Sequence, residues 1–253
     1  MSQPSIDQQL LWDAETARAY DTPGEGMFAP EVIGPTVAAL VDLAEGGPAV
    51  ELAVGTGRVA IPLVEAGVPV VGVELSHAMI ARLREKIDDE RLPVVQGDMT
   101  TTRVGEGFAL VYLVFNTISN LLTQDEQVAC VRNAARHLRP GGRFVVELWV
   151  PQLRALPAGH GATVEVSEPG YLLVDTYDTL RQLVVSHHVG FDPDLGGGRE
   201  ARITRSPHRY AWPSELDLMA RLAGLELEHR WADWDRSPFT ADSRSHVSVY
   251  RLP

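Results

Sequence analysis

The sequence predicts an α/β fold in which a doubly wound, mostly parallel sheet is followed by a β-rich antiparallel section. The first observation is that short apolar runs alternate with helical patterns between residues 49 and 150. Apolar strands joined by helices form parallel sheets that are covered on both faces. The second is that strand-like segments with nearby turn residues follow one another in the last hundred residues. The third is a hydrophobic fraction of 45% over 253 residues, which is enough for a full core.

Each element of the parallel part follows from its local pattern. An amphipathic helix is predicted around residues 7–19 and a second helix over 35–44. The core strands are predicted at 49–54, 70–73, 93–95, 108–115 and 144–150. The helices between them are predicted at 59–66, at 77–87 with Ser76 as its cap, and at 128–138.

The carboxyl-terminal section is predicted to extend or cover this sheet. Its strand-like segments are 171–180, 182–191, 201–212, 225–234 and 243–252, and its one helix is at 213–223. The predicted organisation is therefore a helical lid at 1–46, a ligand-binding core at 47–150, and a β-rich section at 151–253 that completes the sheet and covers the site. An exposed strand edge in this last section would make a homodimer feasible.

Composition and charge disfavour several classes of protein. The 22 lysines and arginines and 34 acidic residues give a net charge of −12, which repels phosphate backbones, so no nucleic acid partner is expected. No run approaches the roughly 18 apolar residues of a membrane span. The first residues lack a secretory signal, which predicts a cytoplasmic protein. A single cysteine, Cys130, excludes an internal disulfide and a multi-cysteine metal site, and no metal is expected.

The segment ELAVGTGRV, residues 51–59, carries the strongest chemical signal. A strand ends and a helix begins across Gly55-Thr56-Gly57, where glycines allow a sharp turn and a close ligand. The free N–H groups of the new helix favour an anionic ligand group. Glu74 ends the second strand and Asp98 follows the third, so both reach the same sheet edge. Carboxylates there can accept hydrogen bonds from ribose hydroxyls and an adenine amino group, which predicts a nucleoside-like ligand.

A dinucleotide site is the rival interpretation of the same turn. Gly55, Gly57 and Ala60 match the G-x-G-x-x-A pattern of nicotinamide-dependent enzymes. Glu51 counts against it, because it places a charge inside a strand that is apolar in dinucleotide folds. Only Arg58 is close by to meet a pyrophosphate. An NAD(P)-dependent oxidoreductase stays open as an alternative.

Four motifs then occur in series, namely ELAVGTG, VELS with Met79 three residues on, QGDM and RPGGRF. In this combination the chain resembles the class I S-adenosylmethionine-dependent methyltransferases over roughly residues 49–150. The resemblance implies a Rossmann-like methyltransferase sheet with S-adenosyl-L-methionine as cofactor. The flanking ETARAYD and the β-rich tail are similar to small-molecule methyltransferases of actinobacterial natural-product pathways. These imply a small-molecule acceptor methylated on N or O. A non-catalytic or repurposed methyltransferase fold is a further alternative.

The resemblance also implies which residues contact the cofactor. The turn from Ala53 to Gly57 would lie under its methionine part, and Glu74 would hold the ribose. Leu75 and Met79 would pack on the adenine, whose amino group would bind Asp98. The complete set of cofactor-binding candidates is Tyr20, Ala53, Gly55, Thr56, Gly57, Arg58, Glu74, Leu75, Met79, Asp98, Met99 and Phe115.

Methyl transfer from a sulfonium is an in-line displacement, so catalysis depends on positioning. Aromatic faces attract a positive sulfur, which makes Tyr20 and Phe115 catalytic candidates. His188 is the candidate base, because one of two adjacent histidines on an alternating strand faces inward. The candidates for contact with the acceptor are Trp12, Asn116 and Trp149.

Two segments of the tail have simpler interpretations. The arginines at 199, 202, 205 and 209 form a basic cluster that is expected on a solvated face, or, in the alternative, on a phosphate of a nucleotide-sugar acceptor. DPDLGGG at 192–198 lacks the full pattern of a calcium loop and predicts a hairpin turn.

Overall fold

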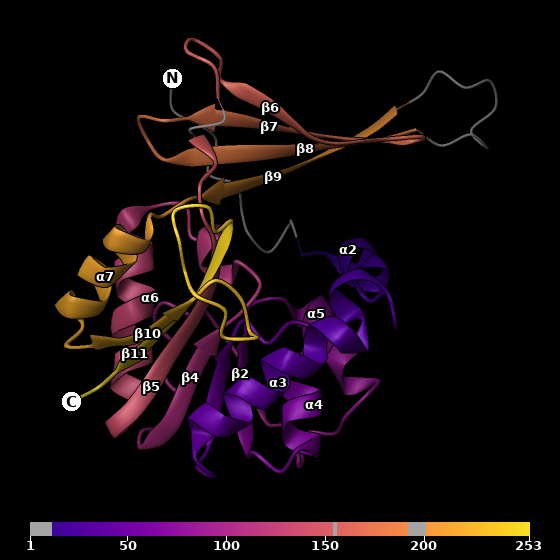
Figure 1. Cartoon of the computed structure of the whole chain (residues 1–253). Helices are drawn as coiled ribbons and strands as arrows, with labels where there is room; N and C mark the ends of the chain where they lie inside the picture. Colours follow the sequence, from indigo (N-terminus) through magenta and orange to yellow (C-terminus); the bar gives the residue numbers. More distant parts are fainter. Residues whose placement is uncertain (1–11, 154–155, 192–200) are drawn as a thin grey trace.

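The computed structural model of the chain describes residues 12–153, 156–191 and 201–253. It contains a seven-stranded sheet and, above one end of it, a separate four-stranded sheet (Figure 1). The strands are β1 (Ala49–Leu52), β2 (Val70–Glu74), β3 (Val94–Gln96), β4 (Phe108–Leu113), β5 (Leu138–Trp149), β6 (Ala162–Glu168), β7 (Tyr171–Asp178), β8 (Leu183–Phe191), β9 (Ala201–Arg209), β10 (Glu226–Trp231) and β11 (Ser245–Arg251).

The helices of the described residues lie mainly before and between the core strands. They are α2 (Ala14–Tyr20), α3 (Pro30–Ala44), α4 (Ala60–Glu65), α5 (His77–Arg84), α6 (Gln124–His137) and α7 (Pro213–Leu222), with short 3-10 turns η1 (Gly26–Phe28) and η2 (Thr117–Asn120). The part of the predicted amino-terminal helix before Trp12 and the predicted turn at 192–198 lie outside the described residues.

The larger sheet confirms the predicted α/β class. Its order is β10-β11-β5-β4-β1-β2-β3. The strands from β1 to β5 pair in parallel, whereas β11 is antiparallel to both β5 and β10. The tail thus both extends the sheet, through β10 and β11, and adds a second sheet of β6 to β9, which we call the roof sheet. Strand β6 was not predicted, because its sequence ATVEVSE carries few apolar residues.

Helices cover both faces of the larger sheet, as apolar parallel strands require. Helices α6 and α7 contribute to the core on one face, and α3, α4 and α5 to the core on the other. The Ser76 hydroxyl caps α5 by accepting from the Met79 N–H at 3.2 Å. Helix α3 begins at Pro30 rather than at Pro35, because proline suits the first position of a helix.

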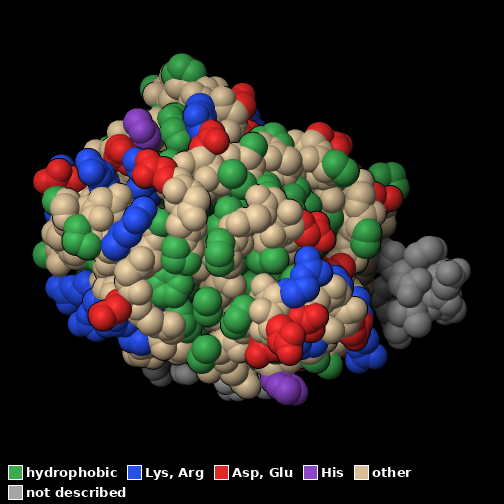
Figure 2. Space-filling model, turned by 90° about the horizontal axis from the view of Figure 1, so that it is seen from below, with side chains coloured by type: hydrophobic (Ala, Val, Ile, Leu, Met, Phe, Trp, Pro, Cys, Tyr) green, Lys and Arg blue, Asp and Glu red, His purple; other side chains and the backbone are tan. Residues whose placement is uncertain are grey.

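The two ends of the molecule differ in what they present. The roof sheet lies at one end, over the larger sheet (Figure 1). The opposite end, seen from below, shows acidic and basic side chains interspersed with hydrophobic ones, and Lys and Arg gathered mainly at one side (Figure 2). No described helix is long and apolar enough to cross a membrane. Among the residues that the structure describes, no group of His, Cys, Asp and Glu side chains could hold a metal ion.

Candidate active site

A cavity of about 490 Å³ lies between the carboxyl-terminal edge of the larger sheet and the roof sheet. We call its two parts the core end and the roof end. The core end is lined by Trp12, Tyr20, Ala53, Gly55, Glu74 and Met79. The roof end is lined by Glu165, Leu173, Asp175, Tyr177, Ser186 and His208, among others. Phe115, Asn116, Ser119 and Trp149 also line it, from the ends of β4 and β5 and the turn η2.

The turn after β1 is shaped by three residues with positive φ. The angles are 56° at Ala53, 56° at Gly55 and 84° at Gly57. A Cβ atom at Gly57 would lie 2.8 Å from Cδ1 of Ile61, so close packing as well as conformation requires glycine there. At Gly55 an added Cβ would meet no atom of the described residues within 4 Å, because this residue borders the cavity. The turn therefore leaves open space beside its backbone.

Glu74 joins this turn to the end of β2. One carboxylate oxygen accepts from the Gly55 N–H at 2.9 Å and the other from the Ser76 N–H at 2.8 Å. The side chain is 6% exposed. Burial raises the pKa of Glu74, and the N–H groups of Ser76 and Gly55 oppose that rise. A fixed carboxylate with further lone pairs thus faces the cavity.

The chain after β4 bends sharply at the centre of the cavity. Phe115 and Asn116 have φ of 53° and 62°, values that are uncommon outside glycine. Carboxylate and amide groups hold this bend, since the Phe115 N–H donates to Glu147 at 2.6 Å and the Asn116 side-chain oxygen accepts from the Trp149 N–H at 2.7 Å. The Arg58 guanidinium lies 4.9 Å from the centre of the Phe115 ring. Backbone strain of this kind is typical of functional sites.

The amino-terminal segment closes the core end. Trp12 and Tyr20 pack edge to face with ring centres 5.8 Å apart. Asp21 fixes the segment by accepting from the Thr56 hydroxyl at 2.6 Å and pairing with the Lys86 ammonium at 2.8 Å. The Trp12 carbonyl accepts from the Ser76 hydroxyl at 2.6 Å. Contacts from both ends of this segment therefore seat it against the turn after β1 and the start of α5.

The structure places some of the predicted site residues in the cavity and others beside it. The residues in its lining are Trp12, Tyr20, Ala53, Gly55, Glu74, Met79, Phe115, Asn116 and Trp149. The residues outside its lining are Thr56, Gly57, Arg58, Leu75, Asp98, Met99 and His188. Asp98 is exposed and accepts from the N–H and hydroxyl of Thr100, each at 2.7 Å.

His188 lies on the inner side of the roof sheet but beyond the cavity lining. It pairs with Leu173, and its Nδ1 lies 2.7 Å from the Tyr171 hydroxyl. The histidine in the lining is His208 instead, to which the sequence alone assigned no role. Strand alternation predicts that residues 173, 175 and 177 share a face. Strand alternation does not tell which of the two faces meets the site, so the sequence analysis did not identify the residues of the roof end.

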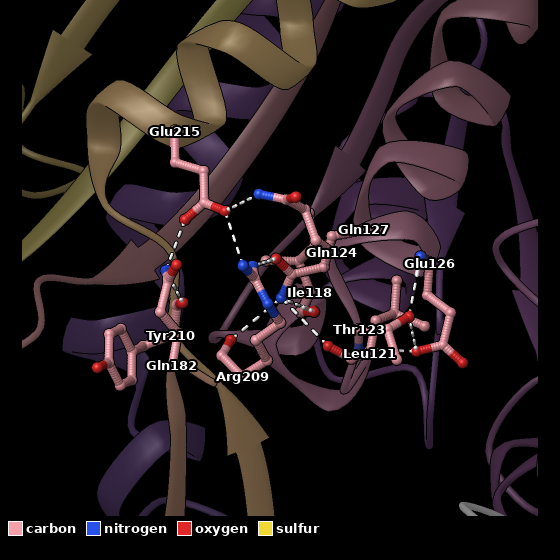
Figure 3. A network of polar contacts seen from close by, with 10 residues as sticks. All are labelled: Ile118, Leu121, Thr123, Gln124, Glu126, Gln127, Gln182, Arg209, Tyr210 and Glu215. Atoms are coloured by element: carbon pink, nitrogen blue, oxygen red, sulfur yellow. Dashed lines mark hydrogen bonds and ion pairs between the residues drawn. The ribbon is translucent and has the colours of Figure 1, made fainter. Parts of the chain in front are cut away.

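A buried polar network attaches the roof sheet to the core (Figure 3). Arg209, at the end of β9, donates to Gln127 of α6 at 2.6 Å and pairs with Glu215 of α7 at 2.7 Å. The Gln127 amide donates to the carbonyls of Ile118 and Leu121, each at 3.2 Å, and so holds η2. Arg209 is 4% exposed. The prediction that Arg209 lies on a solvated face is therefore wrong.

Comparison with known proteins identifies the family. A model described as a methyltransferase domain matches residues 49–142. The CcbJ methyltransferase of Streptomyces caelestis is 37% identical, with a TM-score of 0.83 over 98% of this chain and 99% of that one. The chain belongs to the class I S-adenosylmethionine-dependent methyltransferases. The cypemycin N-terminal methyltransferase of a Streptomyces species is 29% identical over 98% of both chains.

A further relative of the methyltransferase matches over part of its length. The dTDP-3-amino-3,4,6-trideoxy-alpha-D-glucopyranose N,N-dimethyltransferase of Streptomyces venezuelae is 35% identical over 42% of this chain and 44% of that protein. These matches confirm an S-adenosylmethionine-dependent enzyme of the kind found in actinobacterial natural-product pathways. They give no support to an NAD(P)-dependent oxidoreductase.

The core end of the methyltransferase's cavity fits S-adenosylmethionine in its chemistry. It offers a fixed carboxylate at Glu74 for a diol, an apolar side chain at Met79 for a purine, and aromatic rings at Tyr20 and Phe115 for a positive sulfur. The open space beside Gly55 leaves room for a chain of atoms. S-adenosylmethionine supplies an electrophilic methyl group attached to a positively charged sulfur.

Glu51 gives the methyltransferase a predictable pH dependence of stability. It is 3% exposed inside β1 and accepts from the Tyr112 hydroxyl at 3.0 Å. Burial raises its pKa from 4.5 to about 8, against the effects of Tyr112 and Arg58. The folded state therefore keeps a proton that the unfolded state loses, and the stability that is present below pH 4.5 is lost as the pH rises toward about 8.

We expect the melting temperature of the wild type to fall over this pH range relative to that of Glu51→Gln, whose side chain does not titrate. Calorimetric melts of both proteins at several pH values test this. The contributions of other titrating groups to the pH dependence cancel in the difference between the two melting temperatures. Parallel melting curves across the range would contradict the raised pKa.

Proposed function

We propose that this methyltransferase transfers a methyl group to the nitrogen of a small, amine-bearing acceptor. The observation that carries the choice of nitrogen is the charge of the roof end. Asp175 and Glu165 line it, whereas no lysine does, and the one cationic side chain in the described lining is Arg244. Carboxylates attract ammonium-bearing molecules from solution and raise their local concentration.

Asp175 supports this choice most directly. Its Oδ1 atom is buried and has no hydrogen-bond partner among the described residues, and an unpaired buried oxygen favours a ligand that donates. Burial raises the pKa of Asp175. This rise is opposed by a hydrogen bond from Ser186 and by the neighbouring His188 and His187. Two relatives point the same way, since their names describe an N-terminal methyltransferase and an N,N-dimethyltransferase.

The proposed cofactor contacts follow the core end. Glu74 accepts from the ribose hydroxyls, Met79 and Leu75 pack on the adenine, and Asp98 takes its amino group beside Met99. The turn with Ala53, Gly55, Thr56 and Gly57 lies along the methionine part, with Arg58 behind Phe115. Tyr20 and Phe115 flank the positive sulfur, which aromatic faces attract. In this assignment no proton transfer is required of them, because their role is to align the reacting atoms.

The proposed acceptor contacts are Trp12, Asn116 and Trp149, together with the roof end. His188 lies outside the lining, so we propose that it supports Tyr171 and Asp175 rather than touching the acceptor. In this arrangement residues 1–46 act as a lid, 47–150 bind the cofactor and 151–253 complete the sheet and cover the acceptor. We further propose a cytoplasmic enzyme that acts on neither nucleic acid nor membrane. A homodimer through the strand edge of the roof sheet is also predicted.

Methyl transfer to matched acceptors tests the proposed function. Purified protein is incubated with labelled S-adenosylmethionine and pairs of compounds that differ only in an amine or a hydroxyl at one position. Amino sugars, nucleotide-linked amino sugars and peptides with a free amino terminus provide the amines. We expect product only from the amine of each pair, and mass spectrometry locates the added methyl group. Methylation of the hydroxyl compounds instead would overturn the choice of nitrogen.

A further inference from the structure

Most polar side chains near the centre of the cavity are already engaged in holding the backbone. The Asn116 side-chain oxygen accepts from the Trp149 N–H at 2.7 Å. The Ser119 hydroxyl donates to the Asn116 carbonyl at 2.6 Å. Glu147, next to the cavity, accepts from the Phe115 N–H at 2.6 Å. These contacts shape the bend after β4.

His208 differs from these side chains. It lies on β9, lines the cavity, and is positioned by a contact of 3.4 Å between its Nδ1 atom and the Ser119 hydroxyl. Because the Ser119 hydroxyl donates its proton to the Asn116 carbonyl, the Ser119 oxygen can accept a hydrogen bond from His208. In the tautomer that donates from Nδ1 to this oxygen, Nε2 carries a lone pair. Arg209, the next residue, is fixed in the buried network of Figure 3.

The surroundings keep this imidazole neutral. Burial lowers the pKa of His208 to about 4, and the nearby His188 acts in the same direction. At the pH values where an aliphatic amine begins to lose its proton, His208 is an uncharged hydrogen-bond acceptor. A neutral acceptor does not hold a nitrogen in its ammonium form as a carboxylate does. His208 can therefore bind the neutral amine, whereas Asp175 and Glu165 favour its ammonium form.

We propose that His208 positions the acceptor nitrogen, by accepting a hydrogen bond at Nε2 from an N–H of the neutral amine. The assignment rests on the proposed function. With one N–H held, the nitrogen lone pair is free to point along the line of the methyl group and the sulfur. The lone pair forms the new N–C bond, the electron pair of the C–S bond stays on sulfur, and the extra proton of the product nitrogen passes to solvent. Asp175 and Glu165 attract the cation, and His208 orients the deprotonated form.

Two substitutions at this position separate hydrogen bonding from packing. Leucine fills space but cannot accept, whereas the amide oxygen of glutamine can. We expect His208→Leu to lower kcat/KM for an amine acceptor by roughly 5- to 150-fold, the cost of an unsatisfied hydrogen bond. We expect His208→Gln to recover most of that loss. The dissociation constant of S-adenosylhomocysteine, measured by calorimetric titration, should stay unchanged in both variants.

His187→Leu is the matched control. His187 lies on β8 beside His188, on the face of the roof sheet that is turned away from the cavity, with its Nε2 atom 3.0 Å from the Thr176 hydroxyl. Its substitution should leave kcat/KM at the wild-type value. Thermal melts of all three variants report on folding, and each comparison is made at a temperature where every variant is folded.

Three outcomes decide the assignment. A fall in kcat/KM with His208→Leu, recovery with His208→Gln and no change with His187→Leu would support it. Equal losses in His208→Leu and His208→Gln would overturn it, because shape rather than hydrogen bonding would then matter. A wild type that methylates no amine would overturn the proposed function and the role of His208 with it.

Discussion

Replacement of Arg209 by leucine is expected to lower the free energy of unfolding by about 3–5 kcal/mol, the cost of removing one partner of a buried ion pair. The side chains of Arg209 and Glu215 are 5% and 15% exposed. Without the guanidinium, the Glu215 carboxylate keeps the amide groups of Gln124 and Gln182 as partners. The Gln127 side-chain oxygen loses its donor at a fully buried position.

Equilibrium denaturation and calorimetric melts measure this loss. For a chain of this size it corresponds to a melting temperature lower by roughly 6–20 °C. Arg205→Leu is the matched control, because Arg205 is exposed on the same strand. Its effect should stay within about 0.5 kcal/mol. Similar losses in the two variants would mean that the network contributes nothing specific.

The same pair has a pH signature. Burial acts to raise the pKa of Glu215, but the hydrogen bonds from Arg209, Gln182 and Gln124 lower it overall. A lowered folded pKa contributes stability above the unfolded value, and this stability is lost as the pH falls through the folded value. The difference in stability between the wild type and Arg209→Leu should therefore shrink in acid below about pH 4. A difference that is constant with pH would argue that packing alone is lost.

The parallel part of the fold was predictable because its signals are local. Each strand and helix between residues 49 and 149 carries its own periodicity, and Gly55 and Glu74 follow strands whose ends must meet at one sheet edge. The boundaries of the helices were harder to predict from the sequence. Helix α3 is an example, because Pro30 can begin a helix as readily as Pro35 can.

The roof end was less predictable, for reasons that lie in the long-range contacts. Alternation tells which residues of β7 and β8 share a face, but it does not reveal which of the two faces meets the cavity. His208 depends on Ser119, which lies 89 residues earlier. Arg209 is buried because Gln127, 82 residues away, and Glu215 of α7 receive it. No local pattern reports partners at such separations.

Glu74→Ala is expected to weaken the binding of S-adenosylhomocysteine by at least roughly tenfold, because it removes charge-assisted hydrogen bonds worth about 1.5–3 kcal/mol. The structure gives Glu74 two tasks. Its carboxylate fixes the turn by accepting from the Gly55 and Ser76 N–H groups, at 2.9 and 2.8 Å. Its further lone pairs face the cavity, where we propose that they meet the ribose. A single affinity for one ligand does not separate these tasks.

A second ligand separates the two tasks of Glu74. An analogue of S-adenosylhomocysteine without the two ribose hydroxyls should bind the wild type more weakly, since the Glu74 lone pairs would then stay unsatisfied. Glu74→Ala should bind the analogue and the parent compound with nearly the same affinity, because the partner of the hydroxyls is gone. The coupling energy of this cycle isolates the contact between carboxylate and ribose from any change in the turn. If the substitution weakens both ligands by the same factor, Glu74 acts only by shaping the turn, and the ribose has another partner.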